Sequence, residues 1–222
     1  MASTPRDRAR RTVRLLLLAA VVLLPLSFAL DGAVSRALVG WRPPGVEPLA
    51  QLATRLGDGT LTIGLPCVIG LVWWWRGHRA LGVRGLLAGA TVAGAGLLEL
   101  LIKNLSCRGR PTALDAGAFF SRFPCNPMDY AHASFPSGHA TTAFALAVLL
   151  VLWYPRWSAG FLALAGLIGL SRVVLGAHFP SDVLAGAALG TAVALIVHAK
   201  VPGLRRHECE GSPHAEHGIG LR

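Results

Sequence analysis

The stretch LLLLAAVVLLPLSFAL, residues 15–30, decides the class of protein, because it runs for sixteen residues without a charge. Crossing the hydrocarbon core of a bilayer takes about 20 mostly apolar residues, with about 17 as the lower limit. Five more uncharged stretches follow it: residues 59–75, 85–98, 130–155, 157–171 and 183–199. We expect the short ones to extend into their flanks, the third as far as residue 102, and the fourth to begin near Ser137. The sequence therefore predicts an all-α integral membrane bundle of six transmembrane helices.

The composition of the whole chain agrees with this class. Hydrophobic residues make up 53% of the 222 residues and charged residues only 14%, against roughly 25% charged residues in soluble domains. The mean hydropathy is +0.54. So little charge does not cover a water-soluble globule, and the same figures exclude a disordered chain, a collagen-like chain and a disulfide scaffold.

The basic residues predict the orientation in the membrane. With the N-terminus in the cytoplasm, 13 of the 21 Lys and Arg residues fall on the cytoplasmic side, as the positive-inside rule requires. The formal charge of +10 then reflects topology, and we expect no nucleic acid partner. We divide the chain into a basic cytoplasmic arm (1–14), a six-span domain (15–200) and a disordered cytoplasmic tail (201–222). The basic residues before the first span also suit a signal peptide, so cleavage of that span stays open.

Three cations collect at the outer face in this orientation. Lys103 and Arg110 follow the third span, and Arg172 ends the fifth. Charged side chains in a membrane usually have a partner or a function, and three cations together favour an anion such as phosphate. Ser137 and Gly138 open the fourth span, where backbone N–H groups can face the same anion. We interpret these five residues as the phosphate-binding set.

Two histidines accompany the cations. Asp182 follows His178 by four residues, and such a carboxylate can fix the tautomer of an imidazole and raise its basicity. A neutral, oriented His178 can attack phosphorus, and His139 can then protonate the leaving oxygen. We expect Glu99 to pair with Lys103 one helical turn away, and we interpret Arg108 and Arg122 as solvated or phosphate-steering loop residues.

The pattern Lys-x6-Arg-Pro, Pro-Ser-Gly-His, Ser-Arg-x5-His-x3-Asp resembles the signature of the type 2 phosphatidic acid phosphatase superfamily, with all eleven positions matched between residues 103 and 182. The resemblance implies a phosphatase that forms a phosphohistidine and needs no metal or other cofactor. It makes His178 the nucleophile, Asp182 its orienting partner and His139 the acid, with the phosphate bound by Lys103, Arg110, Ser137, Gly138 and Arg172. Vanadium haloperoxidases and soluble bacterial acid phosphatases share the signature, but six spans favour the lipid phosphatases.

The Arg-rich, Lys-poor composition indicates a bacterial source. The spans and the distribution of basic residues predict a multi-pass protein of the cytoplasmic membrane with its active site facing the periplasm or exterior. The resemblance implies substrates of the phosphatidic acid, phosphatidylglycerol phosphate, undecaprenyl diphosphate or lipid A type. A lipid phosphotransferase using the same phosphohistidine stays open, as does a non-catalytic binding or transport protein on the same scaffold. The choice of lipid and the oligomeric state also stay open. Cys107 and Cys125 share the outer loop, where the compartment is oxidising, and we predict a disulfide between them.

Overall fold

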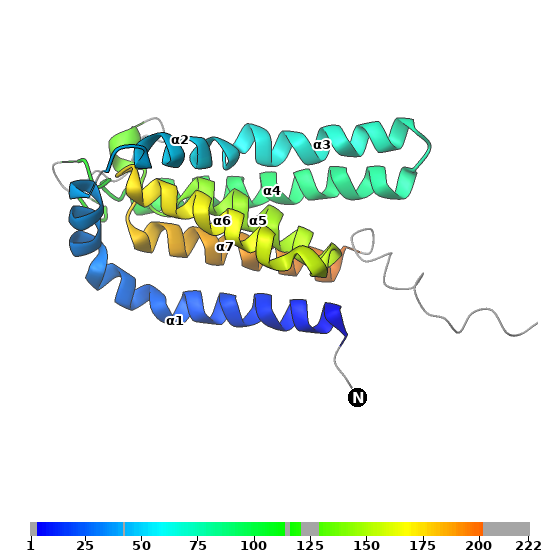
Figure 1. The fold of residues 1–222 in the computed structure, drawn as a ribbon, viewed down its shortest axis with the longest axis horizontal. Coiled ribbons are helices and arrows are strands. Elements are labelled where there is room, and N and C mark those ends of the chain that lie inside the picture. The colour runs from blue at the N-terminus through cyan, green and yellow to red at the C-terminus, as the bar shows by residue number, and fades with distance from the viewer. Residues whose placement is uncertain (1–3, 42, 114–115, 121–128, 202–222) are drawn as a thin grey trace, which may run out of the picture.

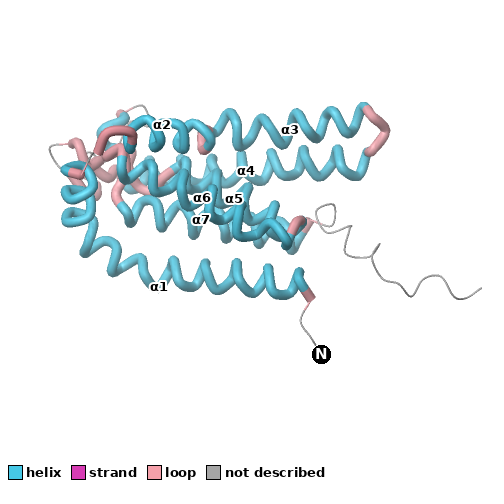
Figure 2. The backbone as a smooth tube through the Cα atoms, in the orientation of Figure 1, coloured by secondary structure: helices cyan, strands magenta, loops and turns pink. Residues whose placement is uncertain are grey.

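The computed structural model describes residues 4–41, 43–113, 116–120 and 129–201, and within these ranges it contains helices and no strands. The helices are α1 (Pro5–Gly40), α2 (Val46–Leu56), α3 (Gly59–Trp75), α4 (Arg79–Ser106), α5 (Gly138–Trp153), α6 (Ser158–Val174) and α7 (Pro180–Lys200), with two short 3₁₀ helices, Tyr130–His132 and Pro155–Trp157. Figure 2 shows long helices side by side, with most of the loops gathered at one end. The predicted all-α class is confirmed.

The count of six spans is not confirmed in full. Four of the described helices are long and apolar enough to cross a membrane, namely α1, α4, α6 and α7, and the bent pair α2–α3 adds a fifth if it is one span. The remaining predicted span is the fourth, which corresponds to α5, and its 16 residues reach about 24 Å. Ten of those residues are buried, because α5 packs against α4, α6 and α7. A helix enclosed by its neighbours does not have to match the full thickness of the lipid itself.

Helix α1 is longer than the predicted first span and is bent. It begins at a capping box in which Thr4 and Asp7 bond to each other's backbone N–H. Pro25 lies inside the helix and removes one helical hydrogen bond there, and Figure 1 shows the second half of α1 turning across the loop end of the bundle. Ala9 and Val13 are buried in the core, so the arm assigned to residues 1–14 is helical from residue 5.

The ends of the helices agree with the predicted topology. The start of α1 and the end of α7 lie at one end of the bundle, and the loops before α5 and α7 lie at the other (Figure 1). Both ends of the described chain therefore lie at the same end of the bundle, as a topology with both termini in the cytoplasm requires. The tail after residue 201 lies outside the described residues.

Small residues let α5 and α7 pack closely. A Cβ atom added at Gly190 would lie 2.1 Å from the Thr141 carbonyl oxygen, and one added at Gly186 would lie 2.5 Å from that of Ser137. Such small residues allow helix backbones to approach in membrane bundles. The close approach brings the N-terminal ends of α5 and α7 together, where Ser137 N–H donates to the Asp182 carbonyl (2.9 Å).

Candidate active site

The family signature consists of three motifs: residues 103–111, 136–139 and 171–182. These three motifs meet at the loop end of the bundle. The Ser137–Asp182 backbone bond joins the second motif to the third. Arg110, from the first motif, donates through Nη1 to the Ala177 carbonyl (2.8 Å) in the loop that carries His178. Segments that lie far apart in the sequence thus form one cluster, as the predicted topology required.

His178 lies in the loop between α6 and α7 and is almost fully buried, with 2% of its surface exposed. Its Nδ1 lies 2.8 Å from the Ser134 carbonyl oxygen. A carbonyl oxygen only accepts hydrogen bonds, so Nδ1 carries the proton and Nε2 keeps a free lone pair. Burial lowers the pKa of His178 to about 3, which keeps the ring neutral. This is the protonation state that a nucleophilic imidazole requires.

Asp182 touches His178 less directly than predicted. Its Oδ2 lies 3.6 Å from His178 Nδ1, beyond hydrogen-bond range. It instead accepts bonds from the Ser134 hydroxyl (2.6 Å) and the Phe179 N–H (2.8 Å). Ser134 therefore contacts both groups, with its carbonyl on the imidazole and its hydroxyl on the carboxylate. The sequence did not point to Ser134, because a backbone carbonyl leaves no trace in a residue pattern.

The three predicted cations are each held by a different kind of partner. Arg110 donates to the carbonyls of Tyr130 (2.6 Å), Ala177 (2.8 Å) and Ala133 (3.1 Å). A guanidinium has five N–H donors, so these bonds fix its plane and leave two donors for a ligand. Lys103 pairs with Glu99 at 2.5 Å, as predicted. Arg172 donates through Nη1 to Thr54 in α2 (2.7 Å).

Two buried polar atoms of the cluster stand out. The Ser137 hydroxyl and the Arg172 Nε have no hydrogen-bond partner among the described residues. A buried polar group without a partner costs about 1–3 kcal/mol. They come from the second and third motifs, and both can donate to an anion. The oxygens of a bound phosphate could accept hydrogen bonds from both donors.

Gly138 and His139 begin α5 next to these groups. A Cβ atom at Gly138 would lie 3.2 Å from Glu99 Oε1, so the α5 start lies close to the Glu99 carboxylate. His139 faces the break between α2 and α3, since a Cβ at Gly57 would lie 3.3 Å from its Cδ2. The sequence did not predict α2, which supplies Thr54 to this wall of the site, while Gly57 caps its C-terminal end.

Arg108 is the clearest error of the sequence-based interpretation. The residue is 3% exposed and forms ion pairs with Asp31 (2.6 Å) and Asp182 (2.5 Å), so it is not a solvated loop residue. The rings that enclose its guanidinium belong to Phe28, Phe119 and Phe179. These partners are spread over the whole chain, and no local pattern joins them. Arg122 lies outside the described residues.

The sequence also did not predict that Tyr130 belongs to the site. Its ring centroid lies 3.6 Å from the Arg110 guanidinium carbon, a cation–π contact, although the side chain is 63% exposed. Tyr130 therefore covers the outer side of the predicted phosphate-binding arginine.

The structure bears on two further predictions, the disulfide and the absence of a metal. Cys107 takes part in a disulfide, but Cys125 lies outside the described residues, so their pairing stays a prediction. In the described part of the chain, no group of three or more His, Cys, Asp or Glu is placed to hold a metal.

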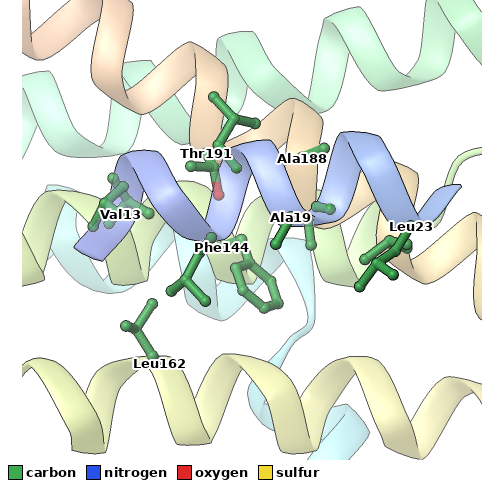
Figure 3. Close-up of a pocket in the computed structure, with 13 residues that line it drawn as sticks. Val13, Ala19, Leu23, Phe144, Leu162, Ala188 and Thr191 are labelled. Atoms are coloured by element: carbon green, nitrogen blue, oxygen red, sulfur yellow. The ribbon is translucent and has the colours of Figure 1, made fainter. Parts of the chain in front are cut away.

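An apolar pocket of about 250 Å³ opens between α1 and helices α5–α7. Figure 3 shows Val13, Ala19 and Leu23 along α1, with Phe144 of α5, Leu162 of α6 and Ala188 of α7 around them. Thr191 is the one residue with a polar side chain among those that line it. Its lining suits a hydrocarbon chain more than a head group.

Comparison with known proteins defines the class. The profile of the PAP2 superfamily matches residues 84–206, which include all three motifs. The chain belongs to this superfamily. Together with the apolar helices, this makes it a multi-pass membrane protein and a phosphoric-ester hydrolase.

Individual relatives show which kind of phosphatase the chain is similar to. The chain is 34% identical to the lipid A 1-phosphatase of Rhizobium etli, over 79% of this chain and 81% of the relative. It is 33% identical to the decaprenylphosphoryl-5-phosphoribose phosphatase of Mycobacterium tuberculosis, over 78% and 90% of the two chains. Among solved structures, a transmembrane PAP2 type phosphatidylglycerolphosphate phosphatase from Bacillus subtilis has a TM-score of 0.62 and 25% identity, covering 82% of this chain and 94% of its own. These relatives are lipid phosphatases, as the sequence predicted for this chain.

Proposed function

We propose that this protein hydrolyses a phosphate or diphosphate group on a membrane lipid through a phosphohistidine at His178. The observation that carries the proposal is a pair of buried donors, Ser137 Oγ and Arg172 Nε, which have no hydrogen-bond partner in the described part of the chain and belong to one cluster with a neutral imidazole. The lipid phosphatases among its relatives support the substrate class.

The proposed reaction has two steps. His178 Nε2 attacks phosphorus, the bond from phosphorus to the lipid-side oxygen breaks, and that oxygen takes a proton from His139. Water then attacks the phosphohistidine and gives its proton to His139, and the phosphorus–nitrogen bond breaks to release phosphate. Arg110, Arg172 and Lys103 offset the charge on the phosphoryl oxygens, with Ser137 and the α5 N-terminus as further donors.

The membrane placement belongs to the same proposal. Residues 15–200 form the phosphatase domain, and the site faces the periplasm or exterior, because 13 of 21 basic residues fall on the opposite side. The apolar pocket beside α1 suits the hydrocarbon tail of the substrate, while the cations receive the head group.

A substrate panel tests the function. The purified protein in detergent would be given phosphatidic acid, phosphatidylglycerol phosphate, undecaprenyl diphosphate and lipid A, without an acceptor lipid and with EDTA present. We expect inorganic phosphate from at least one lipid, and none with His178→Ala. Phosphate release only when an acceptor is added would indicate a phosphotransferase, and inactivity towards every lipid would refute the proposal.

A further inference from the structure

A carboxylate from the first helix reaches the site from outside the family match. Asp31 lies beyond the Pro25 bend of α1 and is 4% exposed, whereas the PAP2 profile begins at residue 84. Its Oδ1 accepts the Ser181 N–H (2.9 Å), and its Oδ2 accepts a bond from the Ser181 hydroxyl. Ser181 directly precedes Asp182, the predicted orienting carboxylate. Helix α1 is therefore hydrogen-bonded to the residue next to it.

Arg108 connects the two carboxylates. One arm of its guanidinium contacts Asp31 (Nη2–Oδ2, 2.6 Å), and the other contacts Asp182 (Nη1–Oδ1, 2.5 Å). The same Nη1 donates to the Ser181 hydroxyl (2.7 Å). Three phenylalanine rings lie 4.4–5.1 Å from its central carbon. These rings exclude water from the network, so its charges act on their neighbours with little screening.

The charges of this network do not cancel. One guanidinium between two carboxylates leaves a formal charge of −1, and Asp182 lies 3.6 Å from the His178 ring. When His178 carries the phosphoryl group on Nε2 and a proton on Nδ1, the ring is positively charged. With Arg108 and Asp182 alone, the neighbouring network would be neutral. Asp31 supplies the remaining negative charge, which stabilises the charged ring.

We infer that Asp31 and Arg108 are positioning residues for the phosphohistidine step: they hold the Asp182 carboxylate in place and keep a net negative charge beside His178. This inference rests on the proposed function of His178. It also gives α1 a role in catalysis besides anchoring the chain in the membrane.

A double-mutant cycle tests the inference with p-nitrophenyl phosphate and the purified protein in detergent. Asp31→Asn keeps the shape of the side chain and removes its charge. We expect kcat to fall about 10- to 100-fold, the range found when an outer partner of a metal-bound histidine is removed, with KM nearly unchanged. The matched control is Glu47→Gln, an exposed carboxylate of α2, which should behave as the unmodified protein does.

The decisive comparison uses Asp182→Asn as the background. Asp31 acts both by holding Asp182 and by its own charge, so adding Asp31→Asn there should lower kcat by a much smaller factor than in the unmodified background. An equal loss in both backgrounds, or an Asp31→Asn variant as active as Glu47→Gln, would overturn the inference. If Asp31→Asn does not fold, Ser181→Ala in the same cycle gives the test: its loss should be smaller and, because Ser181 carries no charge, should vanish in the Asp182→Asn background. An unmodified protein that cleaves no phosphate ester would instead refute the proposed function itself.

Discussion

His178 has the features of a nucleophile that is prepared before the substrate arrives. Its Nδ1 proton is fixed by the Ser134 carbonyl at 2.8 Å, and burial lowers its pKa. The ring thus needs neither a tautomer change nor a deprotonation before Nε2 attacks phosphorus. His139, at the start of α5, is proposed for the opposite task of donating a proton.

The two histidines should therefore respond differently to the leaving group. A lipid alkoxide needs a proton to depart, whereas a nitrophenolate leaves without one. We expect His139→Ala to lose about 10²–10⁴-fold more activity on the lipid than on p-nitrophenyl phosphate, the usual range for general acid catalysis. His178→Ala should lose both activities. Steady-state assays on the two substrates check this, and the reverse pattern would mean that the roles are exchanged.

The lowered pKa of His178 also predicts how stability depends on pH. Its pKa is about 3 in the folded protein and about 6.5 in an unfolded chain. Below pH 6.5 the unfolded chain gains a proton that folded His178 does not take, so the folded state loses relative stability as the pH falls. Above pH 6.5 the effect is absent.

His178→Gln should remove this pH effect. Between pH 7 and pH 5 we expect the unmodified protein to lose about 2 kcal/mol relative to the variant. Apparent unfolding temperatures of both proteins in detergent, measured across this range, provide the check. A constant difference between the two proteins at every pH would show that His178 is not held neutral by burial.

At the scale of elements, the site depends on the close crossing of α5 and α7. Gly190→Ala would place a Cβ 2.1 Å from the Thr141 carbonyl oxygen, so one of the two helices has to move. Overpacking of this kind typically costs about 1–3 kcal/mol. We expect a lower unfolding temperature and lower phosphatase activity, because the start of α5 is displaced from Asp182.

Gly166→Ala in α6 is the matched control, since a Cβ there meets nothing within 4 Å. It should leave both properties unchanged, because the space is open. Equal behaviour of the two alanine variants would show that the α5–α7 crossing does not limit the site.

The elements also show what the sequence was able to predict. Uncharged stretches identified α1, α3, α4, α5, α6 and α7, because the apolar membrane interior excludes charge. They did not reveal α2, whose eleven residues are amphipathic and too short for a span. The number of spans between the motifs predicted that Arg110, Ser137 and His178 meet at one face. It could not predict Asp31 or Arg108, because their contacts depend on the Pro25 bend and on rings from three separate segments.

At the scale of the whole molecule, the predicted orientation has direct consequences for labelling. The loop end of the bundle should face the outside of the cell and both termini the cytoplasm. A cysteine introduced at residue 116 should react with a membrane-impermeant reagent in intact cells, and Cys209 should not. Labelling of Cys209 from outside, with no labelling at residue 116, would reverse the orientation.

The central claim is that the phosphoryl group passes through His178, and trapping it tests this most directly. The purified protein would be mixed with substrate, quenched in alkaline denaturant, which preserves phosphohistidine, and digested for mass spectrometry. We predict one phosphoryl group on the peptide that contains His178, and none on that peptide from His178→Ala. A phosphoryl group on another residue, or turnover with no phosphorylated peptide at any time point, would contradict the claim.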